Sequence, residues 1–274
     1  MENNPLRAHF RQPELYITLP SQGRGWPEGS VRIPANGELA VYSMTAADEI
    51  LMLTPDALMN GEATVQLIQN CVPAIQDAWQ TPTTDLETLL IAIRIASNGE
   101  NIDIESGCPE CNQVSNYLID LKYLIANFDP GIWTVPLTVG NLTFHFRPLN
   151  YQQHNQYGLR IFQSRKKLSQ ANLIEDYDQR DQAVNQIIAE FNSLELRYLI
   201  DTIDCIDTGT EAVSNPEFIS EFILNCDKRI YSQVKEHVEQ LKTATKCSNL
   251  PLTCDQCGHQ FSTELSLDYA SFFE

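Results

Sequence analysis

The chain has 274 residues, of which 43% are hydrophobic, and this is enough to bury a sizeable core in one or two domains. Its 18 basic and 36 acidic side chains give a formal net charge of −18, which argues against a nucleic-acid partner because such affinity depends mainly on lysine and arginine. The sequence has no apolar run long enough to span a membrane, and the N-terminal MENNPLRAHF lacks the basic-then-apolar order of a signal peptide. We therefore expect a soluble, cytosolic protein with reduced thiols.

Residues 1–44 are rich in Pro, Gly and short apolar runs, which predicts an extended arm with short strands. Within this arm, residues 30–34 and 38–42 alternate apolar and polar side chains around Asn36-Gly37. This pattern favours a hairpin between the two segments.

Helix signals follow the arm. Thr45 to Asp48 predicts a capping box, and Thr54-Pro55 predicts the start of another helix. Pro73 should interrupt its helix. A second capping box is predicted at Thr84 to Glu87, at the start of an apolar helix that closes at Asn98-Gly99 and should be central to the core.

The second half of the chain begins with strand signals and continues with helices. Residues 114–121 predict a strand, and residues 135–146 predict a hairpin around Gly140-Asn141. From residue 151 onward helices dominate, and Asn215-Pro216 and Asp227 are typical caps. Apolar residues recur near the helical period at Val184, Ile187, Ile188, Phe191, Leu194, Tyr198, Ile203 and Ile206. The densest basic group, interpreted as a solvated helix face, is Arg160, Arg165, Lys166 and Lys167.

These signals predict an α+β fold that is mostly helical with short strands. We expect three parts: an extended arm at 1–44, a helical and zinc-ribbon domain at 45–130 plus 247–274, and an inserted hairpin and helical domain at 131–246. The second part consists of two separate stretches of the chain, 45–130 and 247–274, and each stretch contains one cysteine pair.

The pairs are Cys108-Pro109-Glu110-Cys111 and Cys254-Asp255-Gln256-Cys257. A Cys-x-x-Cys turn places two sulfurs along one edge of a tetrahedron, so two such turns complete the four-ligand shell of a structural Zn²⁺ ion. The residue after each pair must reverse the chain, which favours a positive φ; Gly258 adopts it freely and Asn112 tolerates it. Strand-like sequence follows each turn. This is the pattern of a two-knuckle zinc ribbon, although 142 residues separate Cys111 from Cys254.

We therefore predict one structural zinc ion per chain, with Cys108, Cys111, Cys254 and Cys257 as ligands. Four thiolates leave no open coordination position, so this metal would not be catalytic. The alternatives are two independent redox pairs, or four buried thiols. A redox pair normally precedes a helix, whereas a strand follows each pair here.

Other cysteines and histidines fit a metal or catalytic role less well. His259 lies just past its turn and Cys247 precedes it by seven residues, so both are poor substitute ligands. The remaining cysteines, expected to be buried inert thiols within helical stretches, are Cys71, Cys205 and Cys226. The remaining histidines, His145 in a strand and His154 and His237 on helices, show no triad spacing. We predict no catalytic or cofactor-binding residue and no enzymatic activity.

The sequence resembles the T4-type bacteriophage baseplate protein family, whose members include a baseplate hub assembly protein of contractile-tailed phages. The likeness is carried by the order of several blocks: LPSQGRGWPEGSVRI, YSMTAADEILML, MNGEATVQLIQNCVPAI, LLIAIRIASNGENIDIESGCPEC and CDQCGHQFSTELSLDYASFF. Together they cover about half the chain.

The resemblance implies a non-enzymatic subunit of the phage tail baseplate, near the hub or wedge, whose partners are other tail proteins. It implies location in the virion, with host cytoplasm as the site of assembly, and no nucleic acid, membrane or small-molecule partner. Trp26 would be either an anchor on a neighbouring subunit or folded back on its own domain. Alternatives are an assembly chaperone that is absent from the finished virion, a zinc-ribbon regulator that contacts nucleic acid or polymerase, and an enzyme.

Overall fold

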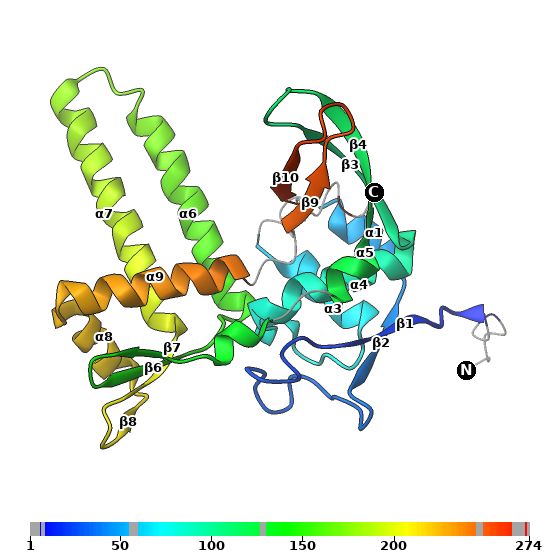
Figure 1. Cartoon of the computed structure of the whole chain (residues 1–274), viewed down its shortest axis with the longest axis horizontal. Coiled ribbons are helices and arrows are strands. Elements are labelled where there is room, and N and C mark those ends of the chain that lie inside the picture. The colour runs from blue at the N-terminus through cyan, green and yellow to red at the C-terminus, as the bar shows by residue number, and fades with distance from the viewer. Residues whose placement is uncertain are drawn as a thin grey trace. The chain divides into compact units, whose positions relative to one another are not determined.

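The computed structural model describes residues 6, 9–54, 60–126, 130–244, 249–264 and 272. The fold is α+β, mostly helical with short strands, as the sequence predicts (Figure 1). The chain divides into two compact units: unit 1 comprises Met1–Asp129 and Lys246–Glu274, and unit 2 comprises Pro130–Thr245. Among the described residues, no helix is both long and apolar enough to cross a membrane.

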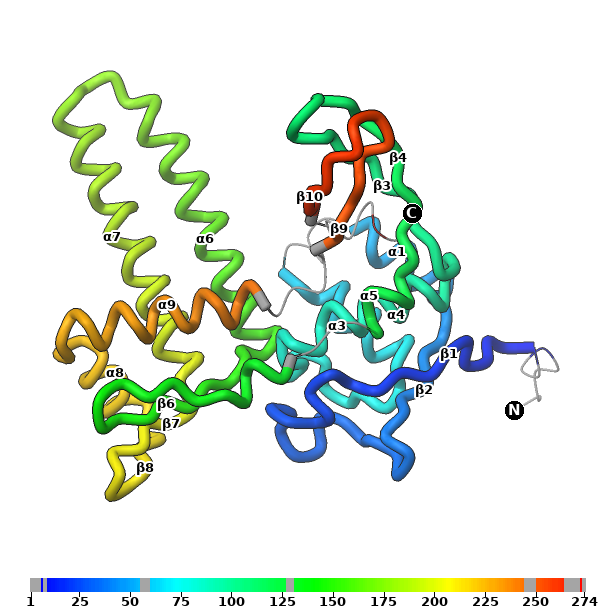
Figure 2. Tube along the Cα trace, viewed as in Figure 1, coloured from blue at the N-terminus to red at the C-terminus, as the bar shows by residue number. Residues whose placement is uncertain are grey.

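Unit 1 contains helices packed beside three two-stranded antiparallel sheets. Its strands are β1 (Pro13–Thr18), β2 (Glu38–Tyr42), β3 (Asn101–Gly107), β4 (Val114–Asp120), β9 (Asn249–Thr253) and β10 (Gln260–Glu264). Its helices are α1 (Ala46–Met52), α3 (Glu62–Cys71), α4 (Thr83–Asn98), α5 (Leu121–Ala126) and the 3-10 turn η2 (Ala78–Gln80). Figure 2 shows β9 and β10, near the C-terminus, beside β3 and β4 from the middle of the chain.

The core of unit 1 surrounds α4, which is buried on nearly every side, as predicted. Apolar residues of α4 and α5 pack with Leu250 and Leu252 of β9 and with Phe272. This core therefore joins the first 126 residues to the C-terminal segment through hydrophobic contact, and Arg94 Nε–H of α4 adds a hydrogen bond of 2.8 Å to the Phe272 carbonyl.

Strand β2 forms where predicted, but its partner in the sequence-based hairpin was wrong. The strand pairs with β1, with Ile17 opposite Leu39, and residues 30–34 do not form its other strand. Instead, Val31 makes an isolated bridge to Ile75. The reason is burial: Leu39 and Val41 need an apolar surface beneath them, and the long-range pair with β1 lies on α4.

The capping box at Thr45 is confirmed, because the side chains and backbone N–H groups of Thr45 and Asp48 pair reciprocally. The second capping box is wrong. Helix α4 begins after Pro82 without a side-chain cap, and Asp85 is fully buried. Helix α3 ends at Cys71, two residues before Pro73. Pro55 lies outside the described residues.

Asp85 anchors the glycine-rich loop that follows β1. Its carboxylate accepts hydrogen bonds from the Ser21 N–H at 2.8 Å, the Ser21 hydroxyl at 2.5 Å and the Trp26 Nε1–H at 2.7 Å. Trp26 is therefore folded back on its own unit. Burial raises the pKa of Asp85, while the bonds from Ser21 and Trp26 oppose that shift.

Unit 2 contains a four-stranded antiparallel sheet and four helices. The strands, in sheet order, are β5 (Leu137–Val139), β6 (Leu142–Phe146), β7 (Ile203–Asp207) and β8 (Ala212–Val213). The helices are α6 (Tyr151–Ala171), α7 (Tyr177–Thr202), α8 (Pro216–Asn225), α9 (Lys228–Ala244) and the 3-10 turn η3 (Pro130–Thr134). The β5–β6 hairpin around Gly140-Asn141 and the cap at Asn215-Pro216 are confirmed.

The helical assignment of Ile203, Cys205 and Ile206 is wrong, because these residues form β7. Pairing with β6 places Ile206 opposite Phe144, and both side chains enter the core of unit 2. A tertiary pairing therefore overrides the local period at this point. The last helix, α9, contributes Val234, Val238 and Leu241 to the same core.

The bond from Trp26 to Asp85 yields a stability prediction. Trp26→Phe removes one donor from a buried carboxylate, so at pH 7 we expect the free energy of unfolding to fall by about 2 kcal/mol. Trp26→Phe should lower the free energy of unfolding by less in an Asp85→Asn background, because residue 85 then carries no buried charge that needs the donor. Denaturant unfolding of the four proteins checks this.

The same bond predicts a dependence on pH. Because the folded-state pKa of Asp85 is raised, its contribution to stability is greatest at low pH and falls as the pH rises through the folded pKa. Trp26→Phe removes an interaction that lowers this pKa. The stability difference between the wild type and Trp26→Phe should therefore grow as the pH rises through the folded-state pKa of Asp85 in the wild type, which lies above its usual range, and level off above the still higher folded-state pKa of the variant. A difference that is constant with pH would contradict this.

Candidate metal centre

The two Cys-x-x-Cys turns are the tips of two antiparallel hairpins in unit 1. In the first hairpin, β3 pairs with β4 from Asn101↔Asp120 to Gly107↔Val114. The six residues 108–113 then connect the strands. In the second hairpin, β9 pairs with β10 as far as Thr253↔Gln260, and residues 254–259 form the connection. Both turns therefore have the same length and the same place in their hairpins.

The first turn is closed by two backbone hydrogen bonds. The N–H of Asn112 donates to the carbonyl of Cys108 at 2.9 Å, and the N–H of Cys108 donates to the carbonyl of Gln113 at 2.9 Å. Asn112 has φ of 56°, in the left-handed region. The prediction of a positive φ at this residue is confirmed.

The second turn repeats this arrangement. The N–H of Gly258 donates to the carbonyl of Cys254 at 2.8 Å, and the N–H of Cys254 donates to the carbonyl of His259 at 2.9 Å. Gly258 has φ of 72°, as predicted. The two turns therefore meet the same backbone requirement with different residues, since Asn is among the few side chains that tolerate this region.

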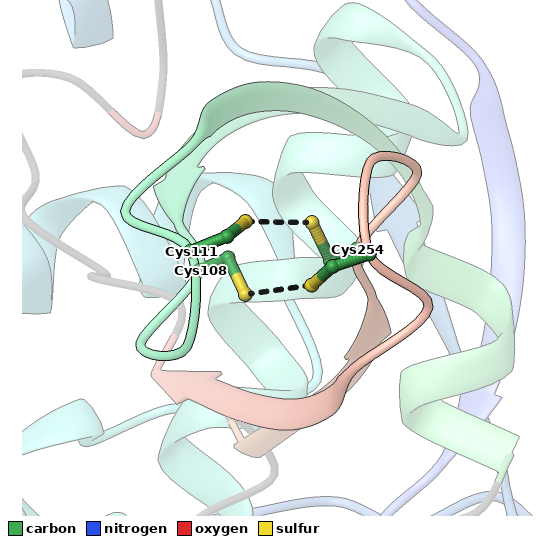
Figure 3. A group of neighbouring side chains, drawn as sticks. Cys108, Cys111 and Cys254 are labelled. Carbon is green, nitrogen blue, oxygen red and sulfur yellow. Dashed lines mark hydrogen bonds between the residues drawn. The ribbon is translucent and has the colours of Figure 1, made fainter.

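The structure brings together all four cysteines that the sequence singles out. The sulfur atoms of Cys108, Cys111, Cys254 and Cys257 lie within 4.8 Å of one another (Figure 3). The Sγ of Cys108 is 3.7 Å from that of Cys257, and the Sγ of Cys111 is 3.7 Å from that of Cys254. In a tetrahedron with metal–sulfur bonds of about 2.3 Å, the sulfurs are about 3.8 Å apart. The cluster thus has the dimensions of a four-thiolate metal site.

Each turn contributes one buried and one exposed cysteine. Cys108 and Cys254 each have 1% of their surface exposed, whereas Cys111 and Cys257 are exposed. The site is therefore built into the surface of unit 1 and has its inner half against protein.

Aromatic side chains support the two hairpins from within. Tyr117 of β4 meets Phe261 of β10 edge to face, with ring centroids 6.2 Å apart. Both pack against the buried cluster formed by α4, α5 and β9. This contact between the hairpins was not predicted from the sequence. In the structure, Tyr117 is one of the half-buried residues that alternate with exposed ones along β4.

Backbone N–H groups favour the thiolate form of one cysteine. Those of Cys257 and Gln256 point to the sulfur of Cys254 and lower its pKa to about 7. At Cys257, the N–H of His259 also favours the thiolate, but burial and the three neighbouring sulfurs together raise its pKa to about 12. The backbone of the second turn therefore favours the thiolate form of Cys254, which is the form in which a cysteine binds a metal ion.

The other candidates lie apart from this cluster. His259 is exposed and stacks on Phe261, with ring centroids 6.4 Å apart. Cys71 is buried at the end of α3, and burial raises the pKa of its thiol to about 11. Cys205 lies in β7 and Cys226 follows α8, so the prediction that both lie within helical stretches is wrong. Both thiols are half-buried rather than buried. Cys247 lies outside the described residues.

No second grouping of potential metal ligands occurs within the part of the chain that the structure describes. His145 lies in β6, and His154 and His237 lie on α6 and α9, where the sequence places them. The four basic residues from Arg160 to Lys167 are exposed on α6. The four sulfurs are therefore the candidate functional site in the described part of the chain.

The left-handed residue of the first turn gives a prediction. Asn112→Val places a β-branched residue at φ of 56° and should lower the free energy of unfolding by about 1–2 kcal/mol. Asn112→Gly should cost less than about 0.5 kcal/mol. Asn116→Val on β4 is the control, because an extended strand accepts valine. Equal effects of valine at 112 and 116, measured by denaturant unfolding, would contradict the argument.

A comparison with protein families gives one match, to the T4 bacteriophage base plate protein family, over residues 26–274. This range includes both cysteine turns and all of unit 2. No curated protein and no solved structure matches the chain. The chain belongs to the T4 bacteriophage base plate protein family.

Proposed function

We propose that the protein is a non-enzymatic structural subunit of a contractile phage tail baseplate, in its hub or wedge region. The observation that carries this proposal is the family match over nearly the whole chain. The subunit acts through contacts with other tail proteins, resides in the virion and is assembled in the host cytoplasm. It needs neither nucleic acid, membrane nor a small-molecule substrate for this role.

We further propose that one zinc ion binds the four cysteines and stabilises unit 1. The spacing of the sulfurs and the repeated backbone geometry of the two turns support this. Thiolate ligands suit zinc, and a shell of four protein ligands leaves no position for a reacting water. The ion would fix the C-terminal hairpin to the hairpin that precedes unit 2, and its role is structural.

Mass spectrometry of purified virions tests the subunit role. We expect the protein in a fixed stoichiometric ratio to the other baseplate proteins. If it is absent from virions whose assembly nevertheless requires its gene, the protein is an assembly chaperone and the structural proposal is wrong. Deletion of the gene should leave heads intact and remove functional tails, which distinguishes a tail role from a general defect in particle formation.

Metal analysis of the purified protein tests the zinc proposal. We expect about one zinc ion per chain, lost in Cys108→Ser and kept in Cys226→Ser, because Cys226 lies in unit 2 outside the cluster. Loss of the ion should lower stability by at least about 5 kcal/mol and the melting temperature by at least about 10 °C. Metal-free protein whose four thiols titrate freely in the native state would contradict the proposal.

A further inference from the structure

Helices α6 and α7 form a long antiparallel hairpin within unit 2, with residues 172–176 as its tip; we call it the helical hairpin. Figure 1 shows the two helices side by side, with α9 across their base. The Tyr157 hydroxyl donates to Asp201 at 2.7 Å near the base, and Lys167 contacts Glu190 at 3.0 Å farther out. The buried seam includes Tyr157, Ser164, Ala171 and Ile187. The two helices are thus in contact along most of their length.

One broad side of the helical hairpin is polar. An open groove on this side is lined by Arg160, Gln163, Ser164, Lys167, Glu190, Ser193 and Leu194. The ion pair of Lys167 with Glu190 lies in it, and the Ser164 hydroxyl is 3.5 Å from the same carboxylate. This side, the polar face, is lined mainly by polar and charged groups and is suited to water.

The opposite side is apolar. Helical geometry places Ile161 and Leu168 across the seam from Arg160 and Lys167, because adjacent residues are about 100° apart around the axis. On α7 the same side carries Val184, Ile188 and Phe191. We call these five residues the apolar face. Ile188 is 47% exposed, and the other four are half-buried.

Helix α7 has more apolar surface than one neighbour can cover. Ile187 is buried in the seam with α6, and helical geometry places Ala183 and Leu194 on the same side of α7. Val184, Ile188 and Phe191 form a second stripe beside them. Together these positions span about 140° of the helix, an apolar arc of the kind that a surface helix turns toward its packing neighbours. Only the base of α7 has further cover among the described residues, where Leu199 and Ile200 join the core of unit 2.

The two edges of the apolar face carry opposite charges. Arg165 borders it on α6, a helix with basic residues and no acidic ones. Asp181 borders it on α7, and Glu175, Asp176 and Asp178 lie at the tip or beside it. The half-buried Arg180 stacks over the Tyr177 ring at the outer end of the face. A partner that covers this face therefore needs acidic groups on one flank and basic groups on the other.

We propose that the apolar face binds an amphipathic α-helix of another baseplate subunit, so that three helices form a bundle. The bound helix carries an apolar stripe, carboxylates along the flank near Arg165 and basic side chains along the flank near Asp181. This inference rests on the proposed subunit role and adds the surface and the chemistry of the partner.

The position of α9 favours a single helix over a second copy of this chain. Lys235 of α9 contacts Glu195 at 3.2 Å, and Glu195 lies two turns after Ile188 on the same side of α7. Helix α9 therefore closes the base of the apolar face, and in a face-to-face pair the α9 of each copy would meet the hairpin base of the other. From Glu195 to Tyr177 about 27 Å of α7 remains open, which matches a helix of about 18 residues.

Site-specific photo-crosslinking in assembled baseplates tests this. A benzophenone amino acid replaces Ile188 on the apolar face or, as the control, Gln163 on the polar face. We expect position 188 to crosslink to one segment of another baseplate protein, whose apolar residues recur at three and four positions with acidic and basic residues on opposite flanks. Position 163 should give at least about tenfold less product.

Several outcomes would overturn the inference. They are crosslinks from position 188 to a second copy of this chain or to a segment without that pattern, equal yields from both positions, and no product from either position in baseplates that contain the protein. Absence of the protein from baseplates would instead contradict the proposed function, and the inference with it.

A matched pair of variants gives an independent measurement. Ile188→Asp and Gln163→Asp each add one carboxylate at the surface of the helical hairpin, so both should keep the wild-type melting temperature. We expect Ile188→Asp to reduce incorporation into baseplates at least about tenfold, because binding would bury the new charge, while Gln163→Asp is incorporated normally. Normal incorporation of Ile188→Asp would contradict the proposed interface.

Discussion

The two Cys-x-x-Cys turns are separated by 142 residues of sequence, yet in the fold of unit 1 their four sulfur atoms lie within 4.8 Å of one another. Closing an unstructured loop of that length costs about 5 kcal/mol in chain entropy. Unit 2 reduces this cost, because most of the intervening residues are ordered around a separate core that includes β6, β7, α8 and α9. Zinc binding to four thiolates is worth about 10–16 kcal/mol in small peptides, so the proposed ion would outweigh the remaining closure cost.

Hydrophobic contact assists the same closure. Leu250, Leu252 and Phe272 are buried against α4 and α5, and Phe261 meets Tyr117 across the two hairpins. Each fully buried side chain of this kind contributes about 1.5–3 kcal/mol. The C-terminal segment is therefore positioned by its core contacts, and the four sulfurs are brought near one another before any metal is considered. A metal at this place stabilises an arrangement that packing already favours.

The sequence predicts the candidate site well because its signals are local. Two Cys-x-x-Cys turns, a residue suited to positive φ after each and strand-like sequence beyond are all visible within about ten residues. The features that sequence reasoning missed depend on distant partners. The partner of β2 was wrong because pairing with β1 is decided by burial on α4, and the role of Asp85 was missed because its partners Ser21 and Trp26 lie more than fifty residues away.

The helical hairpin, too, is only partly predictable from the sequence. Its helices follow from the period of their apolar residues, but which residues face α6 and which remain open follows only from the packing of the pair. On α7 the stripe of Ala183, Ile187 and Leu194 meets α6, so the adjacent stripe of Val184, Ile188 and Phe191 has no equivalent neighbour among the described residues. This open arc is where we place the partner helix. In unit 1 the four cysteines bring two distant parts of the chain together, whereas in unit 2 the open stripe is the proposed contact with another chain.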